Sequence, residues 1–300
     1  MAAAGCPPPA HRTFILESGL RLACNPSGER ATSATVFDIP LPDRGAALAR
    51  ARLELRHTGV SDVTHFWNAR IAIGDEEYAM GIGDDLCAGS EPVNRTNLGY
   101  GKLSAGHDRV RLYAYQGSAP CTDGSLEIMA GSTLEVWIEE GSCPRPQILH
   151  ASHYRQAGFT DTYVWKTGLS PVVRLPYAAA TAESLLVMAV VEGSPDRNPN
   201  QRCGEEVATL SSQLRLDEEV ADTATEILPS SQGMGHLVLD NEIRSWTGPG
   251  DHLIELLVRA DFASSPVRTG GCCGDAAIFL VRRATAGRAA PPDAEPARRR

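Results

Sequence analysis

The sequence predicts an all-β protein made of two tandem antiparallel β-sandwich domains, jelly-roll-like and related by internal duplication. Short apolar runs alternate with turns rich in Gly and Pro, and runs with a helical period are rare. Residues 41–62 and 175–196 resemble each other at a constant spacing of 134 residues. A chain of 300 residues is long enough for two domains, each with its own core.

Four segments follow from this reading. The first sandwich is expected over residues 12–141 and the second over residues 146–284. Between them, at residues 139–146, Gly and two prolines follow a finished strand. Residues 1–11 and the tail 285–300, which is rich in Ala, Pro and Arg and has no apolar period, are expected to be disordered.

A long strand is predicted in each copy, after a Leu-Pro turn. In the first copy Ala51, Leu53 and Leu55 fall on one face, with arginines and glutamate on the other. The composition of this run also suits a helix. The corresponding run 184–192 is apolar on both faces and rich in valine, as in a strand covered on both sides. The second copy therefore favours strand for both.

The remaining elements follow in order. Opening strands are expected at residues 13–16 and 147–150. Residues 216–228 are the best candidate for a helix. Each domain is expected to close with two strands, at 109–117 and 132–140 in the first domain and at 252–260 and 276–284 in the second.

Aromatic side chains suggest a binding surface on the first domain. Alternation in the closing strands buries Leu134 and Val136 and turns Trp137 outward, together with Tyr113 and Tyr115. If these strands are neighbours, the three rings share an exposed face that could stack on a sugar or anchor a protein. Alternatively, this face packs against the second domain or a loop.

Acidic residues form a second candidate site. Asp75, Glu76, Asp84 and Asp85 lie on two loop ends and could hold a calcium ion through their oxygen atoms. The plainer alternative is a solvated hairpin end. The same carboxylates could also form an acid/base pair for sugar hydrolysis.

Catalytic motifs are missing from the sequence. It has no G-x-S-x-G elbow, and its Gly-rich pieces match neither a Walker nor a dinucleotide pattern. The histidines show neither the His-x-His nor the His-x-x-x-His spacing of a metal site. We therefore assign no catalytic residue and no cofactor beyond the possible calcium ion.

The positions of the cysteines give an indication of the cellular compartment. None forms a C-x-x-C pair, which disfavours zinc ribbons and thioredoxin-like sites. Several lie beside turn residues, as in disulfide-linked sandwiches of extracellular, cell-envelope or virion proteins. Free thiols in a cytosolic protein are the alternative. The eight positions are 6, 24, 87, 121, 143, 203, 272 and 273.

Charge and hydropathy restrict the classes of binding partner. A formal net charge of −9 argues against a dedicated nucleic-acid binder. No apolar segment is long enough to span a bilayer, and the N-terminal residues lack the pattern of a signal peptide. Partners among small molecules, neutral polymers and protein surfaces stay open.

The predicted function is binding. The Leu41–Pro42 turn and the run that follows are similar to carbohydrate-binding jelly-roll modules of secreted bacterial proteins, over a short fraction of the chain. We expect a non-enzymatic binding or adhesion protein that presents its aromatic face to a glycan or a protein partner. The alternatives are a two-domain hydrolase that uses loop carboxylates and a self-assembling coat or spike subunit with doubled jelly rolls.

Overall fold

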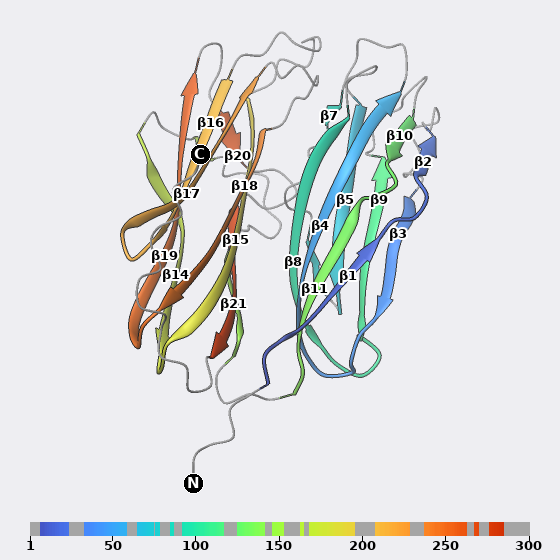
Figure 1. The fold of residues 1–300 in the computed structure, drawn as a ribbon. Coiled ribbons are helices and arrows are strands. Elements are labelled where there is room, and N and C mark those ends of the chain that lie inside the picture. The colour runs from blue at the N-terminus through green and yellow to red at the C-terminus, as the bar shows by residue number, and fades with distance from the viewer. Residues whose placement is uncertain are drawn as a thin grey trace.

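The computed structural model consists of two β-sandwiches placed side by side (Figure 1). None of the described residues is helical, so no helix among them could span a bilayer. The structure describes residues 7–23, 33–58, 65–74, 76–78, 85–86, 92–116, 125–141, 146–152, 163–164, 168–195, 208–228, 237–262, 267–269 and 276–284.

The first domain contains strands β1 to β11, arranged in two sheets. One sheet has the order β1-β11-β4-β10-β2, with β8 also paired to β4, and the other has the order β3-β9-β5-β6, with β7 paired to β5. The strands are β1 Ala10–Ile15, β2 Leu20–Ala23, β3 Ser33–Pro40, β4 Gly45–Thr58, β5 His65–Ile73, β6 Glu76–Tyr78, β7 Asp85–Leu86, β8 Val93–Leu103, β9 Arg109–Gln116, β10 Ser125–Ile128 and β11 Thr133–Glu139.

The second domain contains strands β12 to β21 in the same arrangement. Its sheets have the orders β12-β21-β15-β20-β13, with β18 paired to β15, and β14-β19-β16-β17. The strands are β12 Ile148–Ser152, β13 Tyr163–Val164, β14 Ser170–Ala179, β15 Glu183–Pro195, β16 Ala208–Leu216, β17 Glu219–Leu228, β18 Leu237–Thr247, β19 Gly250–Phe262, β20 Val267–Thr269 and β21 Ala276–Ala284.

Both domains are jelly rolls. In the first domain one path of four strands is β1-β11-β4-β8 and the other is β3-β9-β5-β6, and in the second domain the corresponding paths are β12-β21-β15-β18 and β14-β19-β16-β17. The prediction of two tandem antiparallel jelly-roll-like sandwiches is confirmed. Descent of the two domains from one duplicated segment stays a prediction.

The two long strands show the expected burial. Ala51, Leu53 and Leu55 of β4 lie in the core of the first domain. On β15, Val187 and Ala189 point into the core of the second domain, whereas Met188 and its outward neighbours lie in a separate apolar cluster between the domains. A strand with apolar contacts on both faces explains the continuous apolar run.

The predicted helix at residues 216–228 is wrong. Leu216 ends β16 and pairs with Glu219 at the start of β17, which leaves Asp217 and Glu218 as a two-residue hairpin turn. These two residues have φ angles of 51° and 72°, as a type I′ turn requires. Pairing of β17 with β16 overrides the helical propensity of its Glu and Ala residues.

Two smaller expectations also fail. Leu41 and Pro42 precede β4 as predicted, but Leu175 and Pro176 lie within β14 and not in a turn. β1 begins at Ala10, so ordered structure starts before residue 12. The tail 285–300 lies outside the described residues.

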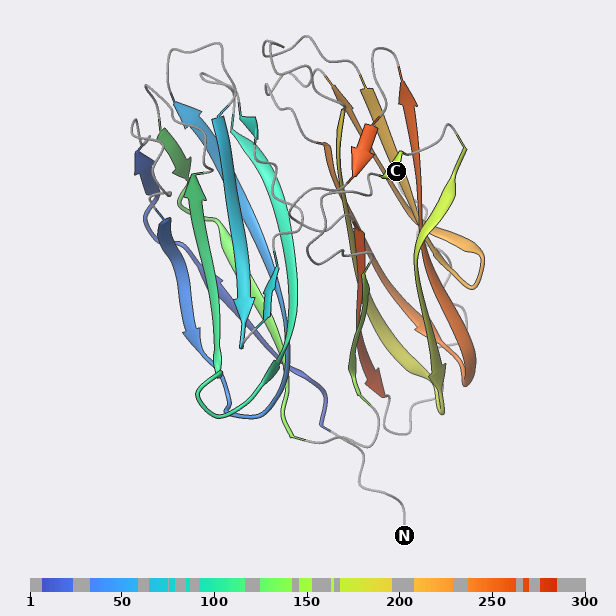
Figure 2. The same cartoon turned by 180° about the vertical axis from the view of Figure 1, so that it is seen from behind.

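The domains face each other through one sheet each, and we call this boundary the seam (Figure 2). Its apolar cluster contains Leu48, Leu98, Trp137, Ile148, Met188, Val190, Ala277, Phe279 and Val281. Near the linker, the Glu139 carboxylate accepts hydrogen bonds from the backbone N–H groups of Gln147 (2.9 Å) and Ile148 (3.0 Å). The end of β11 is thereby tied to the start of β12.

Candidate binding site at the domain seam

Trp137 is not exposed. It points away from the core of the first domain, as alternation predicts, but only 2% of its surface is accessible. The second domain covers it, and the His11 ring stacks on it with a centroid distance of 4.7 Å. The predicted exposed aromatic face is therefore wrong for Trp137, because its outward face is the seam.

Tyr113 lies on the other side of the first domain. Strand β9 pairs with β3 and β5, whereas β11 pairs with β1 and β4, so the two closing strands belong to opposite sheets. Tyr113 is half-buried, and the side chain of Tyr115 lies outside the described residues. Trp137 and Tyr113 cannot share a face, since their strands belong to the two opposite sheets of the sandwich.

The predicted calcium ligands are only partly described. Asp75 and Asp84 lie outside the described residues, as do the side chains of Glu76 and Asp85. The backbone of Glu76 pairs with Ile73 and that of Asp85 with Phe66, at opposite ends of β5. Seven residues of strand separate those ends by about 20 Å. Within the described ranges no three His, Cys, Asp or Glu side chains are grouped to hold a metal ion.

All eight cysteines lie outside the described residues, so the expected disulfides stay a prediction. The compartment inferred from them stays a prediction as well.

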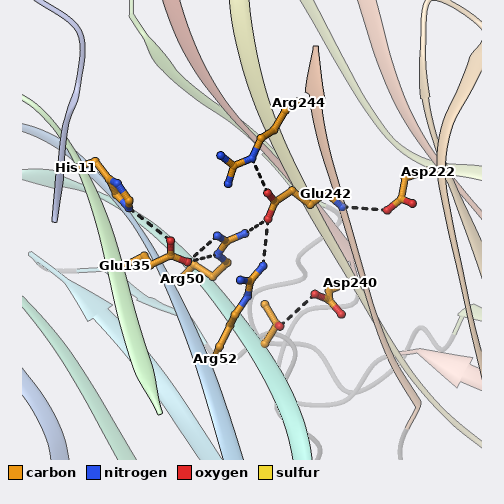
Figure 3. Close-up of polar contacts among 9 residues, drawn as sticks. His11, Arg50, Arg52, Glu135, Asp222, Asp240, Glu242 and Arg244 are labelled. Carbon is orange, nitrogen blue, oxygen red and sulfur yellow. Dashed lines mark hydrogen bonds and ion pairs between the residues drawn. The ribbon is translucent and has the colours of Figure 1, made fainter. Parts of the chain in front are cut away.

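An ion-pair network crosses the seam (Figure 3). Arg50 on β4 is 3% exposed and binds Glu135 of its own domain (2.6 Å). It also binds Glu242 on β18 of the second domain. Arg52 (3.1 Å) and Arg244 (2.9 Å) bind the same Glu242 carboxylate. Arg50 is therefore a buried cation that joins a carboxylate of each domain.

The network keeps Glu242 ionised. Burial alone would raise the pKa of Glu242, but hydrogen bonds and Coulomb attraction from Arg50 and Arg244 lower it below the ordinary value. Behind the carboxylate, the backbone N–H of Glu242 donates to Asp222 (3.1 Å). The side chain is therefore held in one position as an anion.

A pocket opens beside the network, at the end of the seam where β1 and β15 begin and β18 and β21 end. We call it the seam pocket. It has a volume of about 310 Å³ and both domains form its walls. It is lined by His11, Trp137, Ser184, Leu185, Leu186, Arg244, Ser245, Trp246, Val281 and Arg283.

Cross-strand pairing arranges the wall of this pocket in the second domain. Ser184 on β15 pairs with Trp246 on β18 and with Arg283 on β21, so the three side chains form one row across the sheet. Strands lie about 4.8 Å apart, which places the ends of this row about 10 Å from each other. A ring, a hydroxyl and a guanidinium thus stand in line along the pocket.

Trp246 is the most exposed aromatic side chain of the site. It is 44% exposed, and within the described part of the chain its ring stacks on no other ring. The outward direction of Trp246 could have been predicted from the sequence. Leu239 and Ile243 point into the core of the second domain, so alternation along β18 turns Arg244 and Trp246 outward.

A second pocket, of about 460 Å³, lies near the linker and is lined partly by Arg44, Tyr100 and Lys102. The Tyr100 ring stacks on His150 with a centroid distance of 4.3 Å. One face of that ring is therefore already covered, whereas no described ring stacks on Trp246.

Comparison with known proteins identifies no family. No protein-family model and no curated protein sequence matches the chain. Among solved structures, the chain is similar to a peptide-N(4)-(N-acetyl-β-D-glucosaminyl)asparagine amidase, at 10% identity and a TM-score of 0.42 over 92% of this chain and 97% of the other. It is also similar to the tandem CBM22 domains of Xyn10C from Paenibacillus barcinonensis, at 9% identity and a TM-score of 0.23 over 95% of this chain and 100% of the other. Likeness at this level carries no inference about function.

Proposed function

We propose that the protein binds glycans and that the seam pocket is its binding site. The observation that supports this most directly is Trp246, an exposed indole at a pocket that also offers hydroxyl and guanidinium groups. This proposal keeps the predicted class of function and moves the site from the first domain to the seam.

The chemistry of the pocket suits a sugar ring. The C–H groups on one face of a pyranose carry a partial positive charge and pack against the negative face of an aromatic ring. The hydroxyl groups at the ring edge need hydrogen-bond partners, which Ser184 and Arg244 can supply. Trp246 would hold the ring, and the polar side chains would fix its orientation.

Rigid walls favour binding. The pocket lies between two domains that are joined by an apolar cluster and by the buried Arg50. A ligand would therefore enter a preformed site and would not have to order it, which lowers the entropic cost of association.

The nearby carboxylates favour binding over hydrolysis. Glycoside hydrolysis needs a carboxylic acid whose pKa is raised so that it can donate a proton. Glu135 and Glu242, the carboxylates next to the pocket in the described part of the chain, are both bound to Arg50, and the pKa of Glu242 is lowered. Neither is placed to act as a general acid.

The test is Trp246→Ala. The wild-type protein is first screened on an array of immobilised oligosaccharides, and the affinity of both proteins for the best ligand is then measured by calorimetry. We expect affinity to fall about tenfold or more, because the variant loses the apolar area that the indole buries together with a stacking contribution, which is about 0.5–1.5 kcal/mol between aromatic rings.

Two control variants accompany this test. Trp246→Tyr keeps a ring at the site and should retain most of the affinity, whereas Tyr113→Ala removes the ring on the far sheet and should change nothing. Undiminished binding by Trp246→Ala, or loss of binding only with Tyr113→Ala, would contradict the seam pocket as the site.

A further inference from the structure

We infer that the glycan recognised by the seam pocket is acidic, with a carboxylate or sulfate group that pairs with Arg283. This inference rests on the proposed function and adds the class of ligand. It starts from the charges that surround the pocket.

The pocket is cationic in an anionic protein. Its lining contains the guanidinium groups of Arg244 and Arg283, and none of its described lining residues carries a carboxylate. The whole chain has a formal net charge of −9. A local excess of positive charge on such a surface is a feature of sites that attract anionic groups.

The basic side chains of the pocket differ in whether a carboxylate lies next to them. The Nε of Arg244 donates to Glu242 (2.9 Å), and Nε2 of His11 lies 3.5 Å from a Glu135 oxygen. Arg283 is exposed, and no hydrogen bond or ion pair joins it to the described part of the chain. Arg283 is therefore the charge that a ligand could neutralise.

Arg282, the residue before Arg283, is an arginine whose charge is neutralised inside the protein. Arg282 points to the opposite face of β21, where it is 6% exposed. Its Nε and Nη2 bind the two oxygens of Glu183 at 2.8 and 2.7 Å. The inward arginine thus has a matched carboxylate partner, whereas the outward Arg283 lacks one among the described residues.

The spacing along the pocket fits one charged sugar. Trp246 and Arg283 are the two ends of the row centred on Ser184, about 10 Å apart. A pyranose stacked on Trp246 would direct a substituent past Ser184 towards the guanidinium. The planar guanidinium can bind a carboxylate or sulfate through two parallel N–H···O hydrogen bonds.

A nucleic acid would fit this surface less well than an acidic sugar. Binding of a phosphate backbone depends on several phosphate contacts to Lys and Arg side chains, and the pocket offers one guanidinium without a described partner. A single acidic group next to an aromatic ring matches the site better.

The experiment measures three probes by calorimetry with the full chain: an oligogalacturonate, whose charged groups are carboxylates, a carrageenan oligosaccharide, whose charged groups are sulfates, and a neutral cello-oligosaccharide. We expect wild type to prefer an acidic probe over the neutral one, and the two acidic probes show whether that group is carboxylate or sulfate. Arg283→Gln should weaken the acidic interaction about tenfold or more and leave neutral binding unchanged. Arg283→Lys should restore part of the loss, because it keeps the charge without the planar fork.

The outcomes separate the two proposals. If wild type prefers the neutral probe, or if Arg283→Gln binds the acidic probes as wild type does, the inference about charge is overturned. In that case, a Trp246→Ala variant that no longer binds the neutral probe would still support the proposed glycan site. If no variant changes any affinity, or if wild type binds no probe, both proposals fail.

A truncated chain tests one competing occupant. Residues 285–300 leave β21 one residue after Arg283 and include Asp293 and Glu295. A variant that ends at Ala284 should bind the acidic probe as wild type does. Acidic binding that occurs only after truncation would assign the Arg283 partner to the tail and overturn the inference.

Discussion

Two tryptophans, Trp137 and Trp246, occupy comparable places in their domains but differ in solvent exposure. Each points outward from the core of its own domain, on the sheet that faces the other domain. Trp137 is 2% exposed and lies in the apolar cluster of the seam, whereas Trp246 is 44% exposed at the pocket where the seam ends.

The difference shows that alternation places a side chain relative to one sheet only. Whether an outward ring meets water depends on what packs against that sheet, and here a second domain covers one ring and leaves the other open. The two rings should therefore differ in what they contribute, Trp137 to stability and Trp246 to binding.

The largest expected effect is on stability at Trp137. Trp137→Ala should lower the free energy of unfolding by about 4 kcal/mol, because it removes a fully buried ring and leaves a cavity between the domains. Trp246→Ala, the matched control, should change it by less than about 1 kcal/mol. Urea unfolding of both variants measures this comparison, and equal losses would show that the seam does not depend on Trp137.

The second effect concerns Arg50, whose guanidinium stacks over Trp137 at 5.4 Å. Arg50→Met should cost about 3 kcal/mol, since Glu135 and Glu242 would lose the buried cation that neutralises them. Arg52→Met removes an exposed partner of the same Glu242 and should cost less than about 1 kcal/mol. If both variants lose a similar free energy of unfolding in urea, the buried position of Arg50 adds nothing to stability.

The smallest effect is the pH dependence that Glu242 contributes. Its pKa in the folded chain lies below the ordinary value of 4.5, so its stabilising contribution is complete above that pH and is lost as the pH falls through the folded pKa. The excess stability of wild type over Glu242→Gln should therefore be constant near pH 7 and shrink below about pH 4.5. Urea unfolding between pH 7 and pH 3 tests this, and a difference independent of pH would contradict the lowered pKa.

Much of the fold could be predicted from local pattern. The period of two in β4, the two apolar faces of β15 and the turns between strands were enough for two jelly-roll-like sandwiches. Residues 216–228 were misassigned because propensity favoured a helix, and because the turn Asp217–Glu218 lacks the glycine that usually marks a two-residue hairpin, so its pairing with the preceding strand was not recognised. The proposed site is of the predicted kind, an outward aromatic ring, but the exposed ring is Trp246 and not Trp137.

The sequence by itself determined which side chains point away from each core, because a strand sends alternate residues to opposite faces whatever surrounds it. Only the tertiary structure decided which of these outward residues are covered. That depends on the contact between two sheets whose strands are far apart in the chain, which buries Trp137 and Arg50 and leaves Trp246 and Arg283 open at the end of the seam.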